Sequence, residues 1–241
     1  PEDVAAILAE LPEDIVVMAP DIEAYAPYVA AVFEREPQLG FNIADRSLLR
    51  TSPAAESFFK LLMLPAGRLG VSEVLDLLEG QPMAERLGFA AAELELVRRW
   101  VTESGIRWGR DEVHRAELGL PAEPQNTWRA GLARLLMGYA VGGDEFSAGI
   151  LPFEVEIGQA TVLGRFADFC ERLFAFVSES AVPRPLLDWQ RCLLAALDGF
   201  LLPGDETQRL REHLKELGRL AELSGHGGAV GLEVVRAWLS E

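Results

Sequence analysis

The clearest pattern in the chain lies at residues 128–139, where apolar side chains recur at intervals of three and four. Trp128, Leu132, Leu135, Leu136 and Tyr139 follow one another at spacings of 4, 3, 1 and 3. At about 100° per residue these five side chains fall on one stripe of a helix. The same periodicity predicts helices at about residues 53–64, 73–78, 91–103, 162–176, 186–201, 210–217 and 232–239.

Several of these predicted helices have a suitable residue to cap their first turn. Ser52 precedes Pro53, which combines an N-cap hydroxyl with a proline at the first helical position. Ser72 is placed to cap the next short helix, and Asn126 or Thr127 to cap the helix at 128–139. After Pro65 the pattern is therefore expected to be helical.

The first part of the chain has a different pattern. Asp14–Met18 and Phe41–Ile43 are short apolar runs typical of buried strands, and Ile22–Phe33 between them is typical of a helix. We therefore predict a mainly α chain with a small α/β part at its N-terminus. The expected division is a partial α/β segment at residues 1–80 and a helical domain at residues 81–241.

Charge changes the picture of what this chain binds. It has 241 residues with 38 acidic and 22 basic side chains, a net charge of −16, and Lys60 and Lys215 are its two lysines. Because affinity for nucleic acid comes largely from basic contacts to phosphate, the segment alone is expected to bind DNA weakly or not at all, although a local arginine patch stays possible. No apolar run reaches transmembrane length and no leader is evident, which favours a cytoplasmic protein with no membrane contact.

The sequence does not contain the motifs of an ATP-driven motor. A phosphate loop needs glycines around a lysine that is followed by Ser or Thr. Lys60 precedes Leu61 and Lys215 precedes Glu216, and the glycine pair at residues 67–70 is expected to be a turn. We therefore expect no ATP site in this segment.

Metal-dependent catalysis is not indicated either. Asp21 imitates the first acid of a nuclease site, but no Glu-x-Lys comes after it, so a role at a strand end or turn is expected. His114, His213 and His226 lie far apart, and surface or capping roles are expected for them. Cys170 and Cys192 lie in helical patterns and are expected to be buried and reduced. The segment should hold no metal and no cofactor.

Two tryptophans that each adjoin an arginine are the best candidates for contacts. An aromatic ring with a guanidinium group can stack on a base or anchor a partner side chain. Trp128, within the apolar stripe, is expected in the core, whereas Trp108 in a Gly-rich loop is either a buried plug or an exposed contact. Arg107 and Arg129 are expected to pair with acids inside the domain. The candidate contact residues are Arg107, Trp108 and Arg129.

These motifs also carry a family resemblance. Ser104–Gly109, Asn126–Arg129 and Arg134–Tyr139, with Asp14–Ile22 and Tyr25–Tyr28 upstream, resemble the RecC family, the gamma subunits of exodeoxyribonuclease V in RecBCD helicase–nucleases. The resemblance covers most of the chain, with specific motifs in about the first 140 residues. Since the first residue is Pro1, a segment of a longer polypeptide is expected.

The resemblance implies an inactive superfamily 1 helicase-like fold, with the start of its 2A domain followed by most of its helical 2B domain. It implies RecB-like and RecD-like partner subunits, in a parent complex that uses ATP and Mg to unwind and degrade DNA from double-strand ends. The segment would be a non-catalytic, structural or DNA-guiding part. The alternatives are part of an active superfamily 1 helicase whose motor motifs lie outside the segment, and a stand-alone helical protein-interaction domain.

Overall fold

The computed structural model describes residues 52–142, 146, 149–225 and 227–240, together with Tyr25, Tyr28, Val29, Ala31 and Val32. The chain divides into two compact units, residues 1–51 and 52–241. The predicted strands at residues 14–18 and 41–43, and also Asp21 and His226, lie outside the described residues. Within the predicted helix at residues 22–33, the five described residues are helical. The second unit contains nearly all of the described residues.

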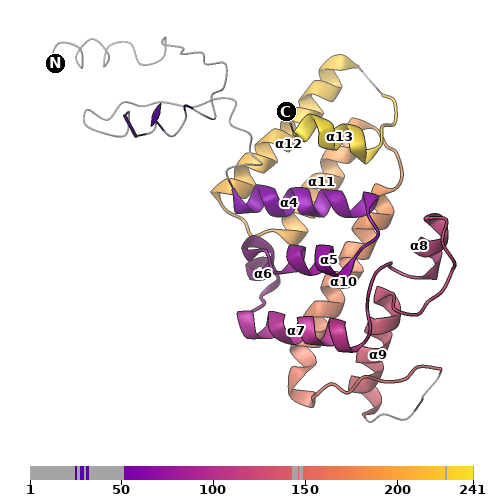
Figure 1. The fold of residues 1–241 in the computed structure, drawn as a ribbon. Coiled ribbons are helices and arrows are strands. Elements are labelled where there is room, and N and C mark those ends of the chain that lie inside the picture. Colours follow the sequence, from indigo (N-terminus) through magenta and orange to yellow (C-terminus); the bar gives the residue numbers. More distant parts are fainter. Residues whose placement is uncertain are drawn as a thin grey trace, which may run out of the picture. The chain divides into compact units, whose positions relative to one another are not determined.

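The second unit consists of helices joined by short loops (Figure 1). Its elements are α4 (Pro53–Met63), η1 (Leu64–Ala66), α5 (Val71–Leu78), α6 (Gln81–Leu87), α7 (Ala91–Glu103), α8 (Glu112–Glu117), α9 (Trp128–Val141), η2 (Ile157–Gln159), α10 (Ala160–Ser180), α11 (Leu186–Phe200), α12 (Asp205–Ser224) and α13 (Leu232–Leu239). An isolated antiparallel β-bridge joins Arg184 and Val230. The prediction of a mainly α chain is confirmed for this unit.

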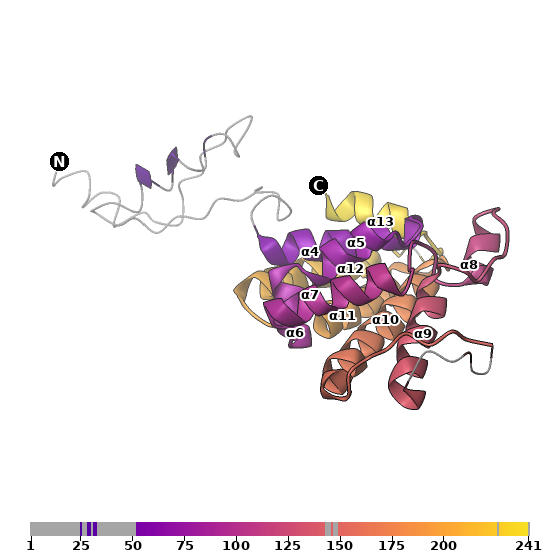
Figure 2. The same ribbon diagram turned by 60° about the horizontal axis from the view of Figure 1, so that its bottom comes forward.

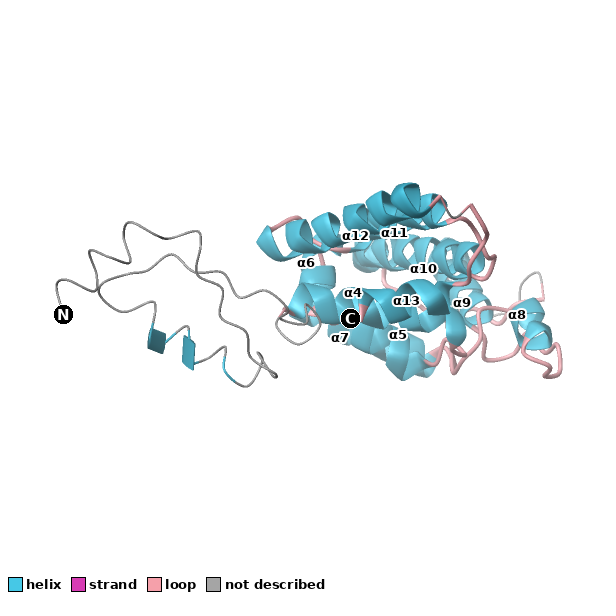
Figure 3. Cartoon of the chain, turned by 90° about the horizontal axis from the view of Figure 1, so that it is seen from above, coloured by secondary structure: helices cyan, strands magenta, loops and turns pink. Residues whose placement is uncertain are grey.

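The helices form two layers. The shorter helices α4, α5 and α7 lie across the longer α10 and α11 in Figure 1, and Figure 2 shows the same two layers from another side. Seen from above in Figure 3, α11 and α12 lie side by side, with α4 and α13 on the opposite layer. Helices α8 and α9 lie at one end of the unit. The two layers enclose the apolar core.

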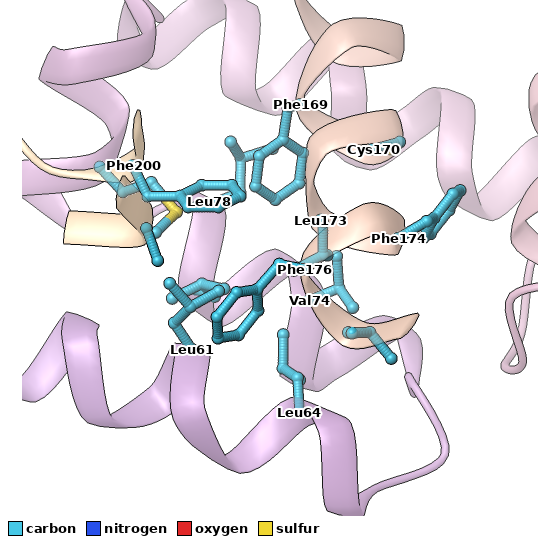
Figure 4. Close-up of a cluster of buried hydrophobic side chains, with 14 of the residues drawn as sticks. Leu61, Leu64, Val74, Leu78, Phe169, Cys170, Leu173, Phe174, Phe176 and Phe200 are labelled. Atoms are coloured by element: carbon cyan, nitrogen blue, oxygen red, sulfur yellow. The ribbon is translucent and has the colours of Figure 1, made fainter. Parts of the chain in front are cut away.

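That core joins the beginning of the unit to its middle. Leu61 and Val74 come from α4 and α5, and they gather with Leu173 and Phe176 of α10 and Phe200 of α11 (Figure 4). All five side chains are buried. The boundary that we expected at residues 80/81 was therefore wrong. The helices α4 and α5 share this core with α10 and α11, and the division falls between residues 51 and 52.

Several sequence predictions are confirmed by this fold. Helices α7 and α13 begin and end at the predicted residues. The stripe at residues 162–176 is buried along its whole length in α10. Cys170 is buried and Cys192 is half-buried, and both are free thiols whose pKa values burial raises.

The predicted caps are confirmed at two helices and wrong at a third. Ser52 accepts the Ala55 N–H at the start of α4, and Thr127 accepts the Ala130 N–H at the start of α9. Ser72, however, lies inside α5. There the Glu73 carboxylate accepts the N–H of Gly70, which precedes the helix, so a serine cap is not needed.

The apolar stripe predicted for α9 is only partly correct. Trp128, Leu132 and Leu135 are buried, but Leu136 and Tyr139 are exposed. The buried face continues instead through Gly131 and Gly138, which lets neighbouring segments approach the helix backbone closely. A count of apolar side chains does not include these glycines. The prediction therefore assigned Leu136 and Tyr139, in place of Gly131 and Gly138, to the buried face of α9.

Candidate functional site

The candidate contact residues lie in a loop that is braced on both sides. This Trp108 loop, residues 104–110, connects α7 to α8. The Arg107 N–H donates to the Asn126 carbonyl oxygen at 2.9 Å, and the Gly109 N–H donates to the Arg68 carbonyl oxygen at 2.9 Å. The Trp128 N–H in turn donates to the Gly109 carbonyl oxygen at 2.9 Å. The loop is thus hydrogen-bonded to the segment before α5 and to the start of α9, which fixes its backbone.

Trp128 occupies the centre of this junction, as the sequence predicted. Its side chain is fully buried and its ring packs against Phe166 with 6.5 Å between centroids. The indole N–H donates to the carbonyl oxygen of Leu69 at 2.7 Å. Leu69 has φ of +54°, an unusual backbone conformation for a branched side chain. The glycine pair around it is part of a turn that presents this carbonyl to Trp128, in agreement with the expected turn.

Trp108 is half-buried, and its partners are not the arginine beside it in the sequence. The Arg115 guanidinium lies 4.1 Å from the centroid of the indole ring, and that of Arg68 lies 6.0 Å away. Both positions suit a cation–π interaction. Part of the Trp108 ring surface is therefore covered by side chains of the same unit.

Arg115 contributes to the Trp108 loop, although the sequence analysis did not single it out. Its side chain is buried, and it donates to the carbonyl oxygens of Glu123 at 2.9 Å and Trp108 at 3.2 Å. Its Nε has no hydrogen-bond partner, and no carboxylate pairs with it, among the residues that the structure describes. Gly109, with φ of +82°, leaves room for it, because a Cβ there would lie 3.2 Å from Nε. Nothing in the local sequence marks Arg115, since the short helix α8 has no apolar periodicity.

Arg129 pairs with acids, as expected. Its guanidinium lies 3.1 Å from Glu171 and 3.5 Å from Asp111, and it also lies over the ring of Phe174. Arg110 forms a second ion pair with Asp111 at 2.8 Å. These residues line a cavity of about 290 Å³ together with Ala175 and Ser178. Two cations face two carboxylates in it, so the cavity is close to neutral.

Neighbouring groups shift the pKa values of Asp111, which lines this cavity, and of His114, whose N–H donates to Asp111. Burial alone would raise the pKa of Asp111, but hydrogen bonds from Arg110 and the His114 N–H, with the charges of Arg110 and Arg129, lower it below its usual value. Burial, followed by the charge of Arg110, lowers the pKa of His114. His114 is buried and its Nδ1 accepts the Arg110 N–H at 3.3 Å. Asp111 caps α8 and His114 supports the loop, which are structural roles.

Arg107 differs from Arg129. Its side chain is exposed and donates to the carbonyl oxygen of Ile106 at 3.1 Å. Within residues 52–142, 149–225 and 227–240 it has no carboxylate partner, so the pairing that we expected is not found there. The guanidinium groups over the Trp108 ring are those of Arg68 and Arg115, and the exposed Arg107 is not one of them.

A second cavity of about 250 Å³ lies where α4, α6 and α12 begin. Its apolar lining comes from Pro53, Pro82, Leu202 and Pro203, and the Glu206 carboxylate accepts the Ala54 N–H beside it at 3.1 Å. A carboxylate of the unit thus already occupies the start of α4. None of the candidate contact residues lies in this cavity.

A search of the described part of the chain found no group of three or more His, Cys, Asp or Glu side chains placed to hold a metal ion. In the same residues, none of the helices combines the length and apolar character required to cross a bilayer.

Comparison with known proteins defines the class to which this helical unit belongs. Residues 51–241 match the family model described as the fourth domain of the RecBCD enzyme subunit RecC. That range includes every helix from α4 to α13. The chain belongs to the RecC family.

Individual relatives agree with the family model. RecBCD enzyme subunit RecC of Escherichia coli (strain K12) is 36% identical over 239 residues, covering 95% of this chain and 21% of the relative. The subunit of the same name from Mycolicibacterium smegmatis is 35% identical over 235 residues, 89% of this chain and 22% of the relative. The subunit of the same name from Haemophilus influenzae is 31% identical over 224 residues, covering 89% of this chain and 19% of the relative. The chain thus spans about a fifth of the length of these relatives.

Proposed function

We propose that this chain is a non-catalytic, protein-contacting part of a RecC-like subunit in a helicase–nuclease complex that processes DNA double-strand ends for recombinational repair. Its partners would be RecB-like and RecD-like subunits, and ATP and Mg would act elsewhere in the complex. The observation that carries the proposal is the match to the RecC fourth domain over residues 51–241. The complex would be cytoplasmic.

We further propose that the helical unit corresponds to the 2B-like part of an inactive superfamily 1 helicase fold, with a 2A-like start before it. Support for treating residues 52–241 as one such part comes from their shared core. In this arrangement the unit contributes shape and contacts to the subunit, and chemistry belongs to the partner subunits.

The ion pairing of the arginine side chains supports the proposal that this chain binds DNA only weakly. Many arginines are held in ion pairs with carboxylates of the same unit, namely Arg98, Arg110, Arg129, Arg165, Arg172, Arg191, Arg211 and Arg219. An arginine that is already paired with a carboxylate gains less from binding a phosphate. Either its ion pair must break, or the carboxylate stays close and repels the phosphate. With a net charge of −16, the chain then offers little free positive surface.

The test measures ATP turnover and DNA affinity on the 241-residue chain, and assembly on the complete subunit that carries it. We expect no DNA-stimulated ATP turnover above background, and binding of forked duplex DNA weaker than micromolar at physiological salt. The complete subunit should co-purify with its RecB-like and RecD-like partners. Arg107→Gln is the matched variant, because the exposed guanidinium of Arg107 has no carboxylate partner in the described part of the chain.

Two results would contradict the proposal. One is ATP turnover by the chain itself. The other is micromolar or tighter DNA binding whose salt dependence becomes shallower in Arg107→Gln, because that change in slope reports the loss of a phosphate contact.

A further inference from the structure

One arginine of this unit contacts an aromatic ring and no acid. The Arg68 side chain is exposed, and its guanidinium lies over the Trp108 ring, 6.0 Å from the ring centroid. Among the residues that the structure describes, it has no carboxylate and no carbonyl partner. Many other arginines of the unit are paired with carboxylates, and further ones donate to carbonyl oxygens. The hydrogen-bonding capacity of Arg68 is therefore unused within the described part of the chain.

The ring contact orients this cation without using its donors. A guanidinium over an aromatic ring is attracted through its charge, and its planar fork of N–H groups stays able to bind a carboxylate with two parallel hydrogen bonds. A mobile arginine loses much of its side-chain freedom on binding, whereas one that already lies over a ring loses less. Trp108 thus gives Arg68 a preferred position that suits recognition of an anion.

The backbone that carries Arg68 is fixed as well. The Arg68 carbonyl oxygen accepts the Gly109 N–H at 2.9 Å, and the next carbonyl oxygen, that of Leu69, accepts the Trp128 indole N–H at 2.7 Å. Trp128 is itself fully buried. The turn at Arg68 is therefore joined both to the Trp108 loop and to the core, which keeps the Cα of Arg68 in place relative to the ring.

A second cation strengthens the positive potential at this ring. The Arg115 guanidinium lies 4.1 Å from the Trp108 centroid, its side chain is buried, and it has no carboxylate partner among the described residues. A buried cation without a counter-charge is costly, and a nearby anion offsets part of that cost. Two guanidinium groups without a carboxylate partner in the described residues thus share one ring, in a chain whose net charge is −16.

We propose that Arg68, placed over Trp108 and supported by the charge of Arg115, binds the carboxylate of an Asp or Glu side chain on a protein surface outside the 241 residues of this chain. The inference rests on the proposed function, because it gives the protein contact a position and a chemistry. Arg68 is then the residue that touches the partner, and Trp108 is the residue that positions it.

A protein carboxylate fits this site better than a nucleic acid or a second copy of the chain. Tight contact with DNA requires several phosphates to be matched by basic groups. Of the two cations at this ring one is exposed, since Arg115 is buried, and the net charge of −16 repels a polyanion. Two copies of the chain repel each other for the same reason. A single carboxylate needs one bidentate partner, which the exposed Arg68 supplies.

Carbodiimide cross-linking tests the chemistry of the partner, because the reagent joins a lysine amine to a carboxylate and forms no such amide with a DNA phosphodiester. Arg68→Lys is introduced into the complete subunit, which is assembled with its RecB-like and RecD-like partners. Arg209→Lys on α12 is the matched control, because Arg209 is exposed and has neither a carboxylate partner nor a ring contact among the described residues.

We expect the variant at residue 68, and not the control, to be linked to an Asp or Glu outside this chain, with a melting temperature equal to that of the parent. Mass spectrometry assigns the link, since Lys60 and Lys215 are the only native lysines of the sequence. Links confined to acids of this chain or of a second copy, or a yield no higher than that of the control, would overturn the proposal.

The positioning role of Trp108 has its own test. Trp108→Phe and Trp108→Leu are each combined with Arg68→Lys. The first keeps a ring face and should keep most of the cross-link, whereas the second removes the ring and should lower the yield. Equal yields from the two variants would contradict a role for the ring.

The salt dependence of DNA binding by the assembled complex separates a carboxylate from a phosphate. Arg68→Gln removes the cation, and the slope of log affinity against log salt should stay that of the parent. A slope shallower by about 1, the value for one lost phosphate contact, would contradict the proposal. If the unmodified subunit fails to assemble, the proposed function fails; if it assembles and residue 68 is linked to no carboxylate outside the chain, only this inference fails.

Discussion

Gly138→Ala should destabilise the chain, although the same change usually stabilises a helix. Replacing glycine by alanine inside a helix ordinarily adds about 0.5–1 kcal/mol of stability. At residue 138, however, a Cβ would lie less than 3.0 Å from the carbonyl oxygen and carbon of Phe153. These are backbone atoms, so no rotamer change relieves the clash. Either α9 or the segment that contains Phe153 must move, and the Phe153–Arg134 hydrogen bond is strained or lost.

We expect a net loss of about 1–3 kcal/mol, the usual range for overpacking, which exceeds the gain from helix propensity. Gly164→Ala in α10 is the matched control, since a Cβ there meets nothing within 4 Å, and it should be neutral or stabilising. Gly131→Ala should lie between the two, because its Cβ would meet the side chain of Ile106, which can adjust. Urea unfolding followed by circular dichroism ranks the three variants. A Gly138→Ala chain as stable as the Gly164→Ala chain would refute the close packing described for α9.

Two buried side chains give further predictions. Trp128→Phe should cost about 2–4 kcal/mol, because it leaves a gap in the core and removes the donor to the Leu69 carbonyl oxygen, and urea unfolding measures it. Since the pKa of His114 is lowered in the folded chain, the unfolded chain takes up its proton first, and stability falls as the pH falls through about 6.5. His114→Gln should flatten that part of the profile of melting temperature against pH, and parallel profiles would contradict it. The pKa of His213 is also lowered, so some slope should remain.

Long, regular periodicity was sufficient to predict most of the helices. In α10 the apolar residues repeat over four turns, and each of those predicted lies in the core. Burial of one stripe along a long helix leaves few alternative orientations, so sequence and tertiary structure agree there. The shorter helices α6 and α8 were missed, since seven and six residues are too few to establish a period. Their positions depend on packing and caps, which a single sequence does not reveal.

The domain boundary and the buried face of α9 failed for a related reason. The short apolar helices α4 and α5 were assigned to a sheet-containing part because they come after predicted strands in the sequence. The segment that contains them packs instead against helices more than a hundred residues later in the chain, with η1 against α10 and α4 against α12. In α9 the close packing depends on two glycines, Gly131 and Gly138, which have no side chain to keep neighbouring segments away. A count of hydrophobic residues does not measure this property. Long-range packing partners decide both features.

The pairing of tryptophan with arginine illustrates how far adjacency in sequence can mislead. Side chains of consecutive residues do not face each other in a helix or in a strand. The guanidinium groups over the Trp108 ring come from Arg115 on a later helix and Arg68 in an earlier loop, whereas Arg107 donates to the Ile106 carbonyl oxygen. The adjacent pair therefore suggested the wrong cation for the Trp108 ring. A contact role for a tryptophan therefore depends on which groups lie near its ring in the folded chain. Near the Trp108 ring, these groups are the guanidinium groups of Arg115 and Arg68 of the same unit.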